Sequence, residues 1–458
     1  MSVDTNNAAF QDALNLIQYT RQSVFLTGKA GTGKSTFLRY VCENTKKKHV
    51  VLAPTGIAAI NAGGSTMHSF FKLPFYPLLP DDPNLSLQRG RIHEFFKYTK
   101  PHRKLLEQIE LVIIDEISMV RADIIDAIDR ILRVYSHNLR EPFGGKQLLL
   151  VGDVFQLEPV VKNDEREILN RFYPTPYFFS ARVFGQIDLV SIELQKVYRQ
   201  TDPVFVGVLD HIRNNTAGAA DLQLLNTRYG SQIEESEADM YITLATRRDT
   251  VDSINEKKLA ELPGDPITFE GVIEGDFPES SLPTSQELVL KPGAQIIFIK
   301  NDFDRRWVNG TIGVIAGIDE EEETIYVITD NGKECDVKRE SWRNIRYRYN
   351  EKTKEIEEEV LGSFTQYPIR LAWAITVHKS QGLTFSRVVI DFTGGVFAGG
   401  QAYVALSRCT SLDGIQLKKP INRADVFVRP EIVNFAGRFN DRQAIDKALK
   451  QAQADVQY

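Results

Sequence analysis

The sequence has little cysteine and no long apolar run. Its 458 residues include only Cys42, Cys335 and Cys409, which lie far apart. So few and so widely spaced cysteines exclude a secreted disulfide scaffold and a local zinc motif. No segment approaches the ~18 apolar residues of a membrane span, and no basic stretch followed by an apolar one marks a signal peptide. We therefore expect an intracellular, cytoplasmic protein without a membrane partner.

The sequence also lacks an excess of positive charge. It has 55 basic and 61 acidic residues, a net charge of −6, whereas a basic balance is typical of nucleic-acid-binding domains. Much of the acid lies in runs at 319–323 and 355–359, which have the composition of solvated loops. Because a groove needs only local positive charge, the net charge does not exclude a nucleic acid. The length predicts several domains of ~100–200 residues.

A complete phosphate-loop motif stands near the start. The stretch "GKAGTGKS" follows the apolar "SVFLT", expected as a buried strand, and opens "STFLRYVCENT", expected as a helix. This setting surrounds a β-phosphate with backbone N–H groups and a helix N-terminus, and it disfavours the alternative of a glycine-rich turn with a surface lysine. Lys34 should reach the β- and γ-phosphates, and the Ser35 hydroxyl should bind Mg²⁺. The other expected nucleotide contacts here are Gly28, Gly31, Thr32, Gly33 and Thr36.

Acidic and amide side chains follow two further apolar runs. Asp115 and Glu116 end "LVIIDE", and Gln156 follows "QLLLVGD". Continuous apolar runs are typical of parallel strands buried on both faces, and ligands bind at the carboxyl ends of such strands. We predict that Asp115 holds Mg²⁺, that Glu116 is the general base, and that Gln156 contacts the γ-phosphate or the attacking water. The alternatives are a helix N-cap for the acids and an ordinary loop residue for Gln156.

Residues 53–71 combine small polar donors with aromatic rings. This composition suits a single nucleic-acid strand, with donors to phosphates and rings stacked on bases. The expected donors are Thr55, Gly56, Ser65, Thr66 and His68. Phe70 and Phe71 are the expected stacking rings, although each fits a core position equally well. The proline-rich segment that follows extends the insertion to about 64–84 and predicts a protruding loop that acts as a wedge.

Candidate phosphate contacts recur in the second half of the chain. Arg199 in "VYRQ" and Arg408 in "YVALSRC" are candidate arginine fingers, which stabilise charge on a transferring phosphoryl group. The cluster His378, Lys379 and Ser380 precedes a strand-like "RVVIDF" and suits phosphate contacts. Each residue alone would more often be structural.

Together these segments resemble superfamily-1 DNA helicases that move 5′ to 3′, in particular the Pif family, with the RecD-like enzymes close behind. The resemblance rests on ordered stretches that cover nearly the whole chain: "GKAGTGKST", "APTGIAAI", "TMHSFF", "IIDEISMV", "GDVFQLEPV", "VYRQ", "TVHKSQG" and "YVALSRC". One position departs from the pattern, because Glu158 stands where the family usually has a second proline. Since Gln156 is retained, we expect hydrolysis to persist and only the local loop contact to change.

The resemblance implies an α/β fold with two RecA-like parallel-sheet domains and ATP in the cleft between them. Lys34, Ser35, Asp115, Glu116 and Gln156 would line the first face, and Arg199 and Arg408 would reach in from the second. Gln11 lies where such helicases often read adenine, and Gly382 would lie at the nucleotide. Thr55, His68, His378 and Lys379 would touch the single strand.

The predicted domains follow from these motifs and from turn signals. Residues 1–185 form the first RecA-like domain, and 186–292 with 365–428 form the second. Residues 293–364 carry two Asn-Gly pairs between alternating apolar positions, which indicate hairpins. We therefore expect an inserted β-barrel similar to the Src-homology-3-type insert of this family. A helix is expected at 121–143, with the polar residues Asp126, Asp129, Arg130 and Arg133 opposite its apolar face. Residues 429–458 should form an exposed C-terminal helix.

The expected function is ATP-dependent, 5′-to-3′ unwinding of tailed duplex DNA by a monomeric core that translocates on single-stranded DNA. Replication, repair, recombination and telomere maintenance are the corresponding pathways, and forks, G-quadruplexes and RNA–DNA hybrids stay open as preferred substrates. A nucleotide-dependent switch or loader and a small-molecule kinase are rival classes. The kinase is disfavoured because the sequence has no recognisable lid or acceptor pocket.

Overall fold

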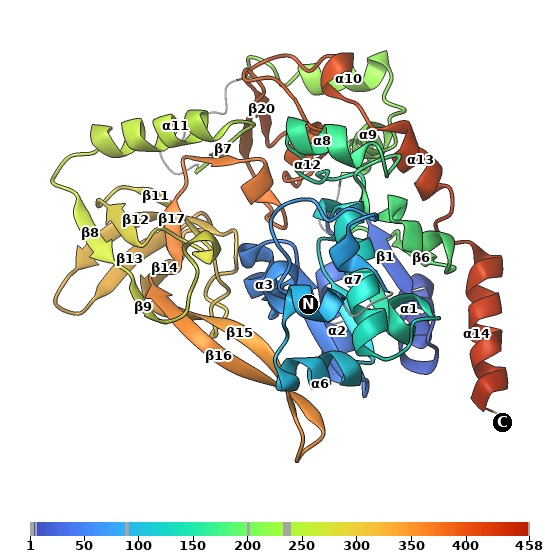
Figure 1. The fold of residues 1–458 in the computed structure, drawn as a ribbon. Helices are drawn as coiled ribbons and strands as arrows, with labels where there is room; N and C mark the ends of the chain where they lie inside the picture. Colours follow the sequence, from blue (N-terminus) through green and yellow to red (C-terminus); the bar gives the residue numbers. More distant parts are fainter. Residues whose placement is uncertain (1–3, 5–6, 88–90, 199–201, 232–239, 457–458) are drawn as a thin grey trace.

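The computed structural model describes residues 4, 7–87, 91–198, 202–231 and 240–456. A first α/β domain is built on one parallel sheet and a second on another, and smaller antiparallel sheets lie to one side of them (Figure 1). This architecture confirms the predicted α/β class with separate parallel sheets. No helix in the described ranges is both long and apolar enough to cross a membrane.

The sheet of the first domain has the strand order β3-β2-β4-β5-β1-β6, and all of its pairings are parallel. Its strands are β1 (Val24–Gly28), β2 (His49–Ala53), β3 (Ser65–Thr66), β4 (Leu111–Ile114), β5 (Gln147–Val151) and β6 (Val190–Leu194). The helices between and around them are α1 (Ala8–Tyr19), α2 (Lys34–Asn44), α3 (Gly56–Ala62), α4 (Met67–Phe71), α5 (Arg91–Phe96), α6 (Lys100–Gln108), α7 (Ala122–Tyr135) and α8 (Asn163–Leu169).

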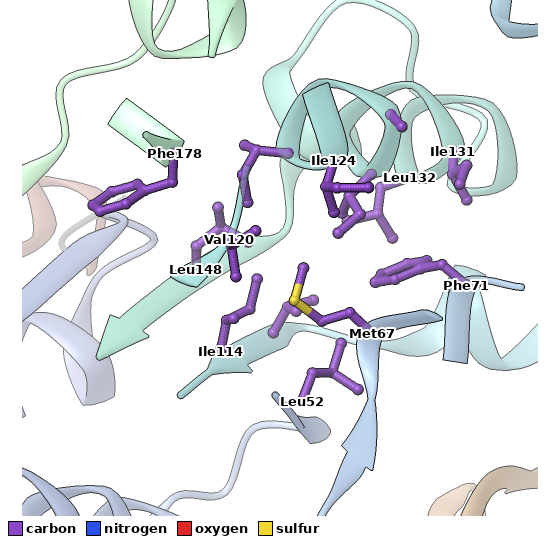
Figure 2. Close-up of a cluster of buried hydrophobic side chains, with 14 of the residues drawn as sticks. Leu52, Met67, Phe71, Ile114, Val120, Ile124, Ile131, Leu132, Leu148 and Phe178 are labelled. Carbon is purple, nitrogen blue, oxygen red and sulfur yellow. The ribbon is translucent and has the colours of Figure 1, made fainter. Parts of the chain in front are cut away.

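Both faces of this sheet are buried, which explains why its strands are continuous apolar runs. Successive residues of a strand point to opposite faces. Accordingly, Leu111 and Ile113 pack with α1 and α2, whereas Ile114 joins the core under α7. Figure 2 shows the core between the sheet and α7, which contains Leu52 of β2, Leu148 of β5 and Ile124 of α7.

The polar face of α7 is buried, in contrast to an ordinary solvated face. Asp126 accepts hydrogen bonds from the Tyr173 hydroxyl (2.9 Å) and from the Arg182 and Val183 amides (3.0 Å each). Asp129 pairs with Arg133 and accepts from the Phe143 amide (2.6 Å). Buried carboxylates are stable only when paired or hydrogen-bonded. These acids therefore tie the surrounding loops to the helix and are largely shielded from solvent.

The second domain has the parallel strand order β18-β7-β19-β20 around a core of its own. Its strands are β7 (Ile242–Ala245), β18 (Ala374–Thr376), β19 (Val388–Asp391) and β20 (Ile415–Leu417). Its helices are α9 (Pro203–Arg213), α10 (Ala219–Asn226), α11 (Arg248–Glu261) and α12 (Gln401–Leu406). The helices α9 and α12 pack against each other.

Antiparallel sheets occupy the chain between β7 and β18, over a wider range than the predicted 293–364. One sheet has the order β14-β13-β12-β11-β17, another β15-β16-β9, and β10 pairs with β8. These strands are β8 (Ile267–Glu270), β9 (Val272–Gly275), β10 (Glu287–Leu290), β11 (Gln295–Phe298), β12 (Ile312–Asp319), β13 (Thr324–Thr329), β14 (Glu334–Val337), β15 (Glu340–Asn350), β16 (Glu355–Gln366) and β17 (Ile369–Leu371).

The two Asn-Gly pairs of this region differ in role. Gly332 has a φ of +77° in the tight turn between β13 and β14, as the hairpin signal predicts. At the other pair, β11 and β12 form the predicted hairpin, but Gly310 lies at the end of the longer loop 299–311 that connects them and not in a tight turn. The Trp307 ring stacks on Phe298 (4.4 Å) and holds this longer loop against the sheet. Ring packing therefore replaces turn geometry at this connection.

The long ribbon β15–β16 reaches the first domain (Figure 1). The Val51 amide donates to the Tyr347 hydroxyl (3.3 Å), and Tyr347 and Tyr349 join the core under α7. The insert therefore contacts the first domain, although its sequence interrupts the second.

The chain ends back on the first domain, as α13 (Pro430–Ala436) and α14 (Arg442–Val456). Ile445 and Ala448 of α14 are buried in the core shared with α1, and Arg442 pairs with Asp12 of α1 (2.6 Å). The predicted exposed C-terminal helix is therefore wrong in its exposure, because one side of α14 packs on α1.

Candidate nucleotide and nucleic-acid sites

A cleft of about 1020 Å³ lies at the carboxyl ends of β1, β4 and β5 and is closed on its other side by the second domain. Ligands bind in this position in open parallel α/β sheets. The first domain contributes the phosphate loop, the Asp115–Glu116 pair and Gln156, and the second contributes Gly382, Thr384 and Arg408. Residues far apart in the sequence therefore face one cavity.

The phosphate loop depends on glycine at defined positions. Gly31 and Gly33 have φ values of +80° and +92°, which glycine adopts without strain. A Cβ at Gly28 would lie 2.7 Å from the Leu194 carbonyl oxygen, so a side chain has no room there. Gly33 precedes α2 without any side-chain cap, which leaves the first amides of the helix for an anion. Thr32 is buried and bonds to the Lys29 carbonyl, while Ser35 and Thr36 line the cleft.

Lys34 lies at the base of the same loop. Its Nζ donates to the Gly28 and Lys29 carbonyl oxygens, at 2.6 and 3.0 Å. Its positive charge lowers the pKa of both Asp115 and Glu116 against the larger opposing effect of burial. The lysine and the two acids therefore interact electrostatically within one site.

The acid pair follows β4 in a strained conformation. The Glu116 amide donates to Asp115 Oδ1 (2.9 Å), and Glu116 has a φ of +51°, which is rare for a residue with a side chain. Burial, followed by the neighbouring Asp115 carboxylate, raises the pKa of Glu116 to about 7. A carboxylate with a pKa near neutrality is well matched to accept a proton. Such strain and such pKa shifts are typical of functional sites.

Gln156 lies where the first domain meets the second. Its amide nitrogen donates to Asp153 Oδ2 (3.3 Å), and its Oε1 accepts from Gln381 of the second domain (3.5 Å). Asp153 also pairs with the buried Arg213 of α9 (3.2 Å). Sequence reasoning missed Asp153 and Arg213, although Asp153 lies inside the quoted stretch "GDVFQLEPV".

Arg408 is buried, with 1% of its surface exposed, and its guanidinium group is fixed by main-chain oxygens. Nη1 donates to the Ser380 and Leu383 carbonyls (3.3 Å each), and Nε donates to Val404 O (2.9 Å). The residue lines the cleft, and its charge lowers the pKa of Glu116. Arg199, the other predicted arginine finger, lies outside the described residues.

At the other end of the cleft, α1 supplies different residues from the one predicted. Asn7 and Phe10 line it together with Asp4, Leu194 and Tyr198. Asn7 caps α1 by accepting from the Ala9 amide (3.0 Å), and Phe10 packs edge-on against Phe37 of α2. Gln11 is half-buried on the next position of α1 and is not among the lining residues. The aromatic signal "AAF" could have pointed to Phe10.

Thr55 and Thr66 lie at the carboxyl ends of the paired strands β2 and β3. Each caps a helix, because Thr55 accepts from the Ala58 amide (3.2 Å) and Thr66 from the Ser69 amide (3.1 Å). A Cβ at Gly56 would clash with Ser281 of the insert, so packing against the insert explains this glycine. Both hydroxyl protons stay free to donate in this geometry, since each oxygen only accepts.

The prediction of base stacking by Phe70 and Phe71 is wrong. Phe70 is 4% exposed and Phe71 is fully buried, and both belong to the core under α7 (Figure 2 labels Phe71). The short helix α4 turns both rings inward, so they cannot reach a base. The exposed ring of this region is Phe75, which is 84% exposed and lies parallel to the His68 ring at 5.0 Å.

The second domain repeats this pairing of a histidine with an exposed phenylalanine. His378 lies beside Phe397, which is 61% exposed, with the rings stacked at 6.5 Å. Burial lowers the pKa of both His68 and His378, so these rings are neutral at pH 7. Lys379 is exposed, but the Ser380 hydroxyl is buried and bonds to the Val377 carbonyl, which contradicts its predicted contact with a nucleic acid. Neither Phe75 nor Phe397 was among the predicted contacts.

A phosphate loop on one parallel sheet faces an arginine from a second sheet across a shared cleft. This arrangement defines a phosphate-loop protein with a pair of RecA-like domains, the class predicted from the sequence.

Comparison with known proteins specifies the class. Residues 4–212 match the family described as PIF1-like helicase. The ATP-dependent DNA helicase Pif1 of Campylobacter jejuni is 34% identical over 414 residues, which cover 86% of this chain and 88% of that protein. Human ATP-dependent DNA helicase PIF1 is 32% identical over 86% of this chain, which spans 58% of the human protein. The chain belongs to the PIF1-like helicase family.

Solved structures agree with this assignment. Bacteroides sp Pif1 in complex with ADP-AlF4 has 41% identity and a TM-score of 0.86, with 96% of this chain and 97% of that chain covered. Bacteroides Pif1 bound to single-stranded DNA has the same identity and a TM-score of 0.67, with 97% and 99% covered. The structure of this chain therefore superposes more closely on the first of these two structures than on the second.

Proposed function

We propose that this protein is an ATP-dependent DNA helicase that translocates 5′ to 3′ on single-stranded DNA. The observation that carries the proposal is that one cleft combines the phosphate loop, Glu116 and Gln156 of the first domain with Arg408 of the second. A nucleotide in such a cleft contacts both domains, so that its binding and hydrolysis change their relative position. The relatives named as ATP-dependent DNA helicases support this reading.

The geometry supports a chemical role for each residue of the cleft. The phosphate-loop amides and Lys34 bind the phosphates. Glu116 accepts a proton from the attacking water, while the water oxygen forms a bond to the γ-phosphorus and the bond between this phosphorus and ADP breaks. Gln156 orients that water, and Arg408 stabilises the charge that develops on the γ-phosphoryl oxygens. Arg199 would share this role. Gln11 remains the proposed contact of adenine, beside Phe10.

The donor set fits Mg²⁺. Ser35 supplies a hydroxyl and Asp115 a carboxylate, both lining the cleft. The described residues contain no cluster of three or more His, Cys, Asp or Glu side chains that could enclose a metal. Magnesium typically uses one or two protein ligands and completes its shell with phosphates and water. Bound Mg²⁺ would neutralise phosphate charge, and Ser35 and Asp115 would hold it.

The proposed DNA contacts come from both domains. Thr55, Thr66 and Lys379 supply donors to backbone phosphates, and the His68–Phe75 and His378–Phe397 pairs supply rings for bases. Stacking tolerates any base, which suits a motor that moves along arbitrary sequence. With one ring pair on each domain, closing and opening the cleft would move the strand stepwise. The loop that carries Phe75 is the proposed wedge for strand separation.

The decisive experiment measures unwinding of duplexes with a single-stranded 5′ or 3′ tail, together with ATP hydrolysis with and without oligo(dT). A helicase of the proposed polarity unwinds only the 5′-tailed duplex. A switch or loader hydrolyses ATP in a DNA-dependent manner without unwinding, and the ATP hydrolysis of a kinase does not change when DNA is added. Equal unwinding from both tails refutes the polarity.

The finer properties extend the same proposal. We take the active unit to be a monomer, which sedimentation of the DNA-bound protein tests. Since its substrate is DNA, we place its action inside the cell, in replication, repair, recombination or telomere maintenance. Forks, G-quadruplexes and RNA–DNA hybrids are alternatives that unwinding rates on matched substrates separate.

A further inference from the structure

Two successive residues of the phosphate loop are held by the second domain. Lys29 Nζ pairs with Asp210 Oδ2 of α9 at 2.6 Å. The Ala30 amide donates to the Tyr403 hydroxyl of α12 at 3.2 Å. None of Lys29, Asp210 and Tyr403 lines the nucleotide cleft, whereas Ala30 does. These contacts therefore act on the loop from outside the site.

Burial makes the contact between Ala30 and Tyr403 specific. The two residues are 6% and 4% exposed. Little solvent therefore reaches this contact, and an unpaired buried amide is costly. The side chains of Asp210 and Lys29 are partly exposed (29% and 23%), so their ion pair contributes little to stability. Its effect is to orient the Lys29 side chain toward α9.

The helix that carries Tyr403 also leads to Arg408. At its other end, Gly400 packs so closely on the backbone of Phe155 and Gln156 that a Cβ would lie 2.1 Å from the Gln156 carbonyl oxygen. The helix α12 is thus fixed at one end against the Gln156 loop and in its middle against the phosphate loop. Arg408 follows the C-cap residue Ser407 and is held by carbonyls of its own domain. Any shift of α12 consequently moves the arginine and the phosphate loop together.

We propose that Tyr403 and Asp210 are positioning residues that fix the phosphate loop to the arginine-bearing side of the cleft and thereby set the affinity for nucleotide. They act through Ala30 and Lys29 and do not touch the nucleotide. The proposal rests on the proposed function only in taking this cleft as the nucleotide site.

The test is direct binding of a fluorescent N-methylanthraniloyl derivative of ADP, followed by steady-state hydrolysis of ATP. Tyr403→Phe removes only the hydroxyl and should weaken binding about three- to tenfold, as expected for one buried hydrogen bond. KM for ATP should rise by the same factor while kcat changes less, because the loop still closes on bound nucleotide. The matched control is Tyr326→Phe, an exposed tyrosine of β13.

A double-mutant cycle tests the ion pair. Lys29→Met and Asp210→Asn should each weaken binding of the ADP derivative, and the double variant should be no weaker than the worse single variant. Glu261→Gln, an exposed acid of α11, is the control. A melting curve close to that of the parent shows that each variant is folded.

The outcomes separate this proposal from the helicase proposal. Parent-like affinity of Tyr403→Phe, or additive effects in the cycle, overturns the positioning role. A parent protein that binds the ADP derivative but does not unwind DNA refutes only the helicase, since the binding measurements still decide the positioning role. A parent protein that does not bind the ADP derivative overturns both.

Discussion

The guanidinium group of Arg429 forms two hydrogen bonds with the carboxylate of Glu158, from Nε to Oε2 (2.7 Å) and from Nη2 to Oε1 (3.3 Å). The Tyr177 hydroxyl donates to the same carboxylate (2.8 Å). Arg429 immediately precedes α13, where the chain returns from the second domain to the first, and Glu158 follows the Gln156 loop. Glu158, the residue that departs from the family pattern, therefore connects the loop that follows Gln156 to the segment in which the chain returns to the first domain.

Glu158→Gln should destabilise the protein and leave ATP hydrolysis close to that of the parent. Losing the charge-assisted hydrogen bonds of a half-buried carboxylate costs about 1–2 kcal/mol. Hydrolysis persists because Gln156 is held by Asp153 and Gln381 and not by Glu158. Urea denaturation measures the change, with the exposed Glu167→Gln of α8 as the control. An unchanged free energy of unfolding would contradict the role of the pair.

The raised pKa of Glu116 predicts a pH-dependent rate. Glu116 accepts a proton only when ionised, so kcat/KM for ATP should fall as the pH decreases through about 7. The free enzyme determines the pH profile of kcat/KM, which makes it the appropriate measurement. Glu116→Gln should lower the rate at pH 8 by about 10²–10⁴ and remove this acidic limb.

The control for this profile is Glu94→Gln, an exposed acid of α5 that should keep both the rate and the limb. A parent profile that is flat between about pH 6 and pH 8 would exclude Glu116 as the base in its predicted ionisation range.

The sequence predicts the parts of this protein that depend on local pattern. Apolar runs ending in Asp115 or Gly152 identify parallel strands buried on both faces, and the glycine spacing identifies the phosphate loop. Pattern does not distinguish a core ring from a stacking ring, because Phe70 and Phe75 lie in similar aromatic contexts. The helix α4 turns Phe70 into the core and leaves Phe75 exposed, and this difference in burial depends on tertiary packing.

Contacts between residues that are distant in the sequence are the second feature that the sequence pattern does not predict. The Asp126 and Asp129 carboxylates accept hydrogen bonds from loop amides outside α7, so the periodicity of the helix alone assigns them to a polar face. Likewise, Tyr403 lies inside a recognised stretch, yet its bond to Ala30 spans 373 residues and has no local signal. Such pairs become visible only once both domains are placed.

Phe75 and Phe397 should contribute to binding of single-stranded DNA. Replacing either ring with alanine removes one stacking platform and should weaken binding by about 1–3 kcal/mol. Anisotropy of labelled oligo(dT) measures this, with Phe303→Ala as control, since Phe303 is 98% exposed on the insert. Parent-like binding of both variants would refute the proposed stacking sites.

Phe71→Ala should affect stability where Phe75→Ala affects DNA binding, which distinguishes a core ring from a ring that contacts DNA. Deleting a fully buried ring leaves a cavity and should cost about 3–5 kcal/mol of stability. A thermal melt should therefore show a large loss for Phe71→Ala and almost none for Phe75→Ala. Similar melts for the two variants would contradict the burial of Phe71.

Arg408→Lys should lower kcat far more than it changes KM for ATP. Lysine keeps the positive charge but loses the planar fork that donates to the Ser380 and Leu383 carbonyls, so the charge is no longer held in place. An arginine finger acts in the transition state and is worth about 10³–10⁵ in rate, and a loss confined to the transition state appears in kcat. The exposed Arg438→Lys is the control. A variant whose kcat is unchanged, or whose loss appears only in KM, would show that Arg408 is a structural residue of the second domain.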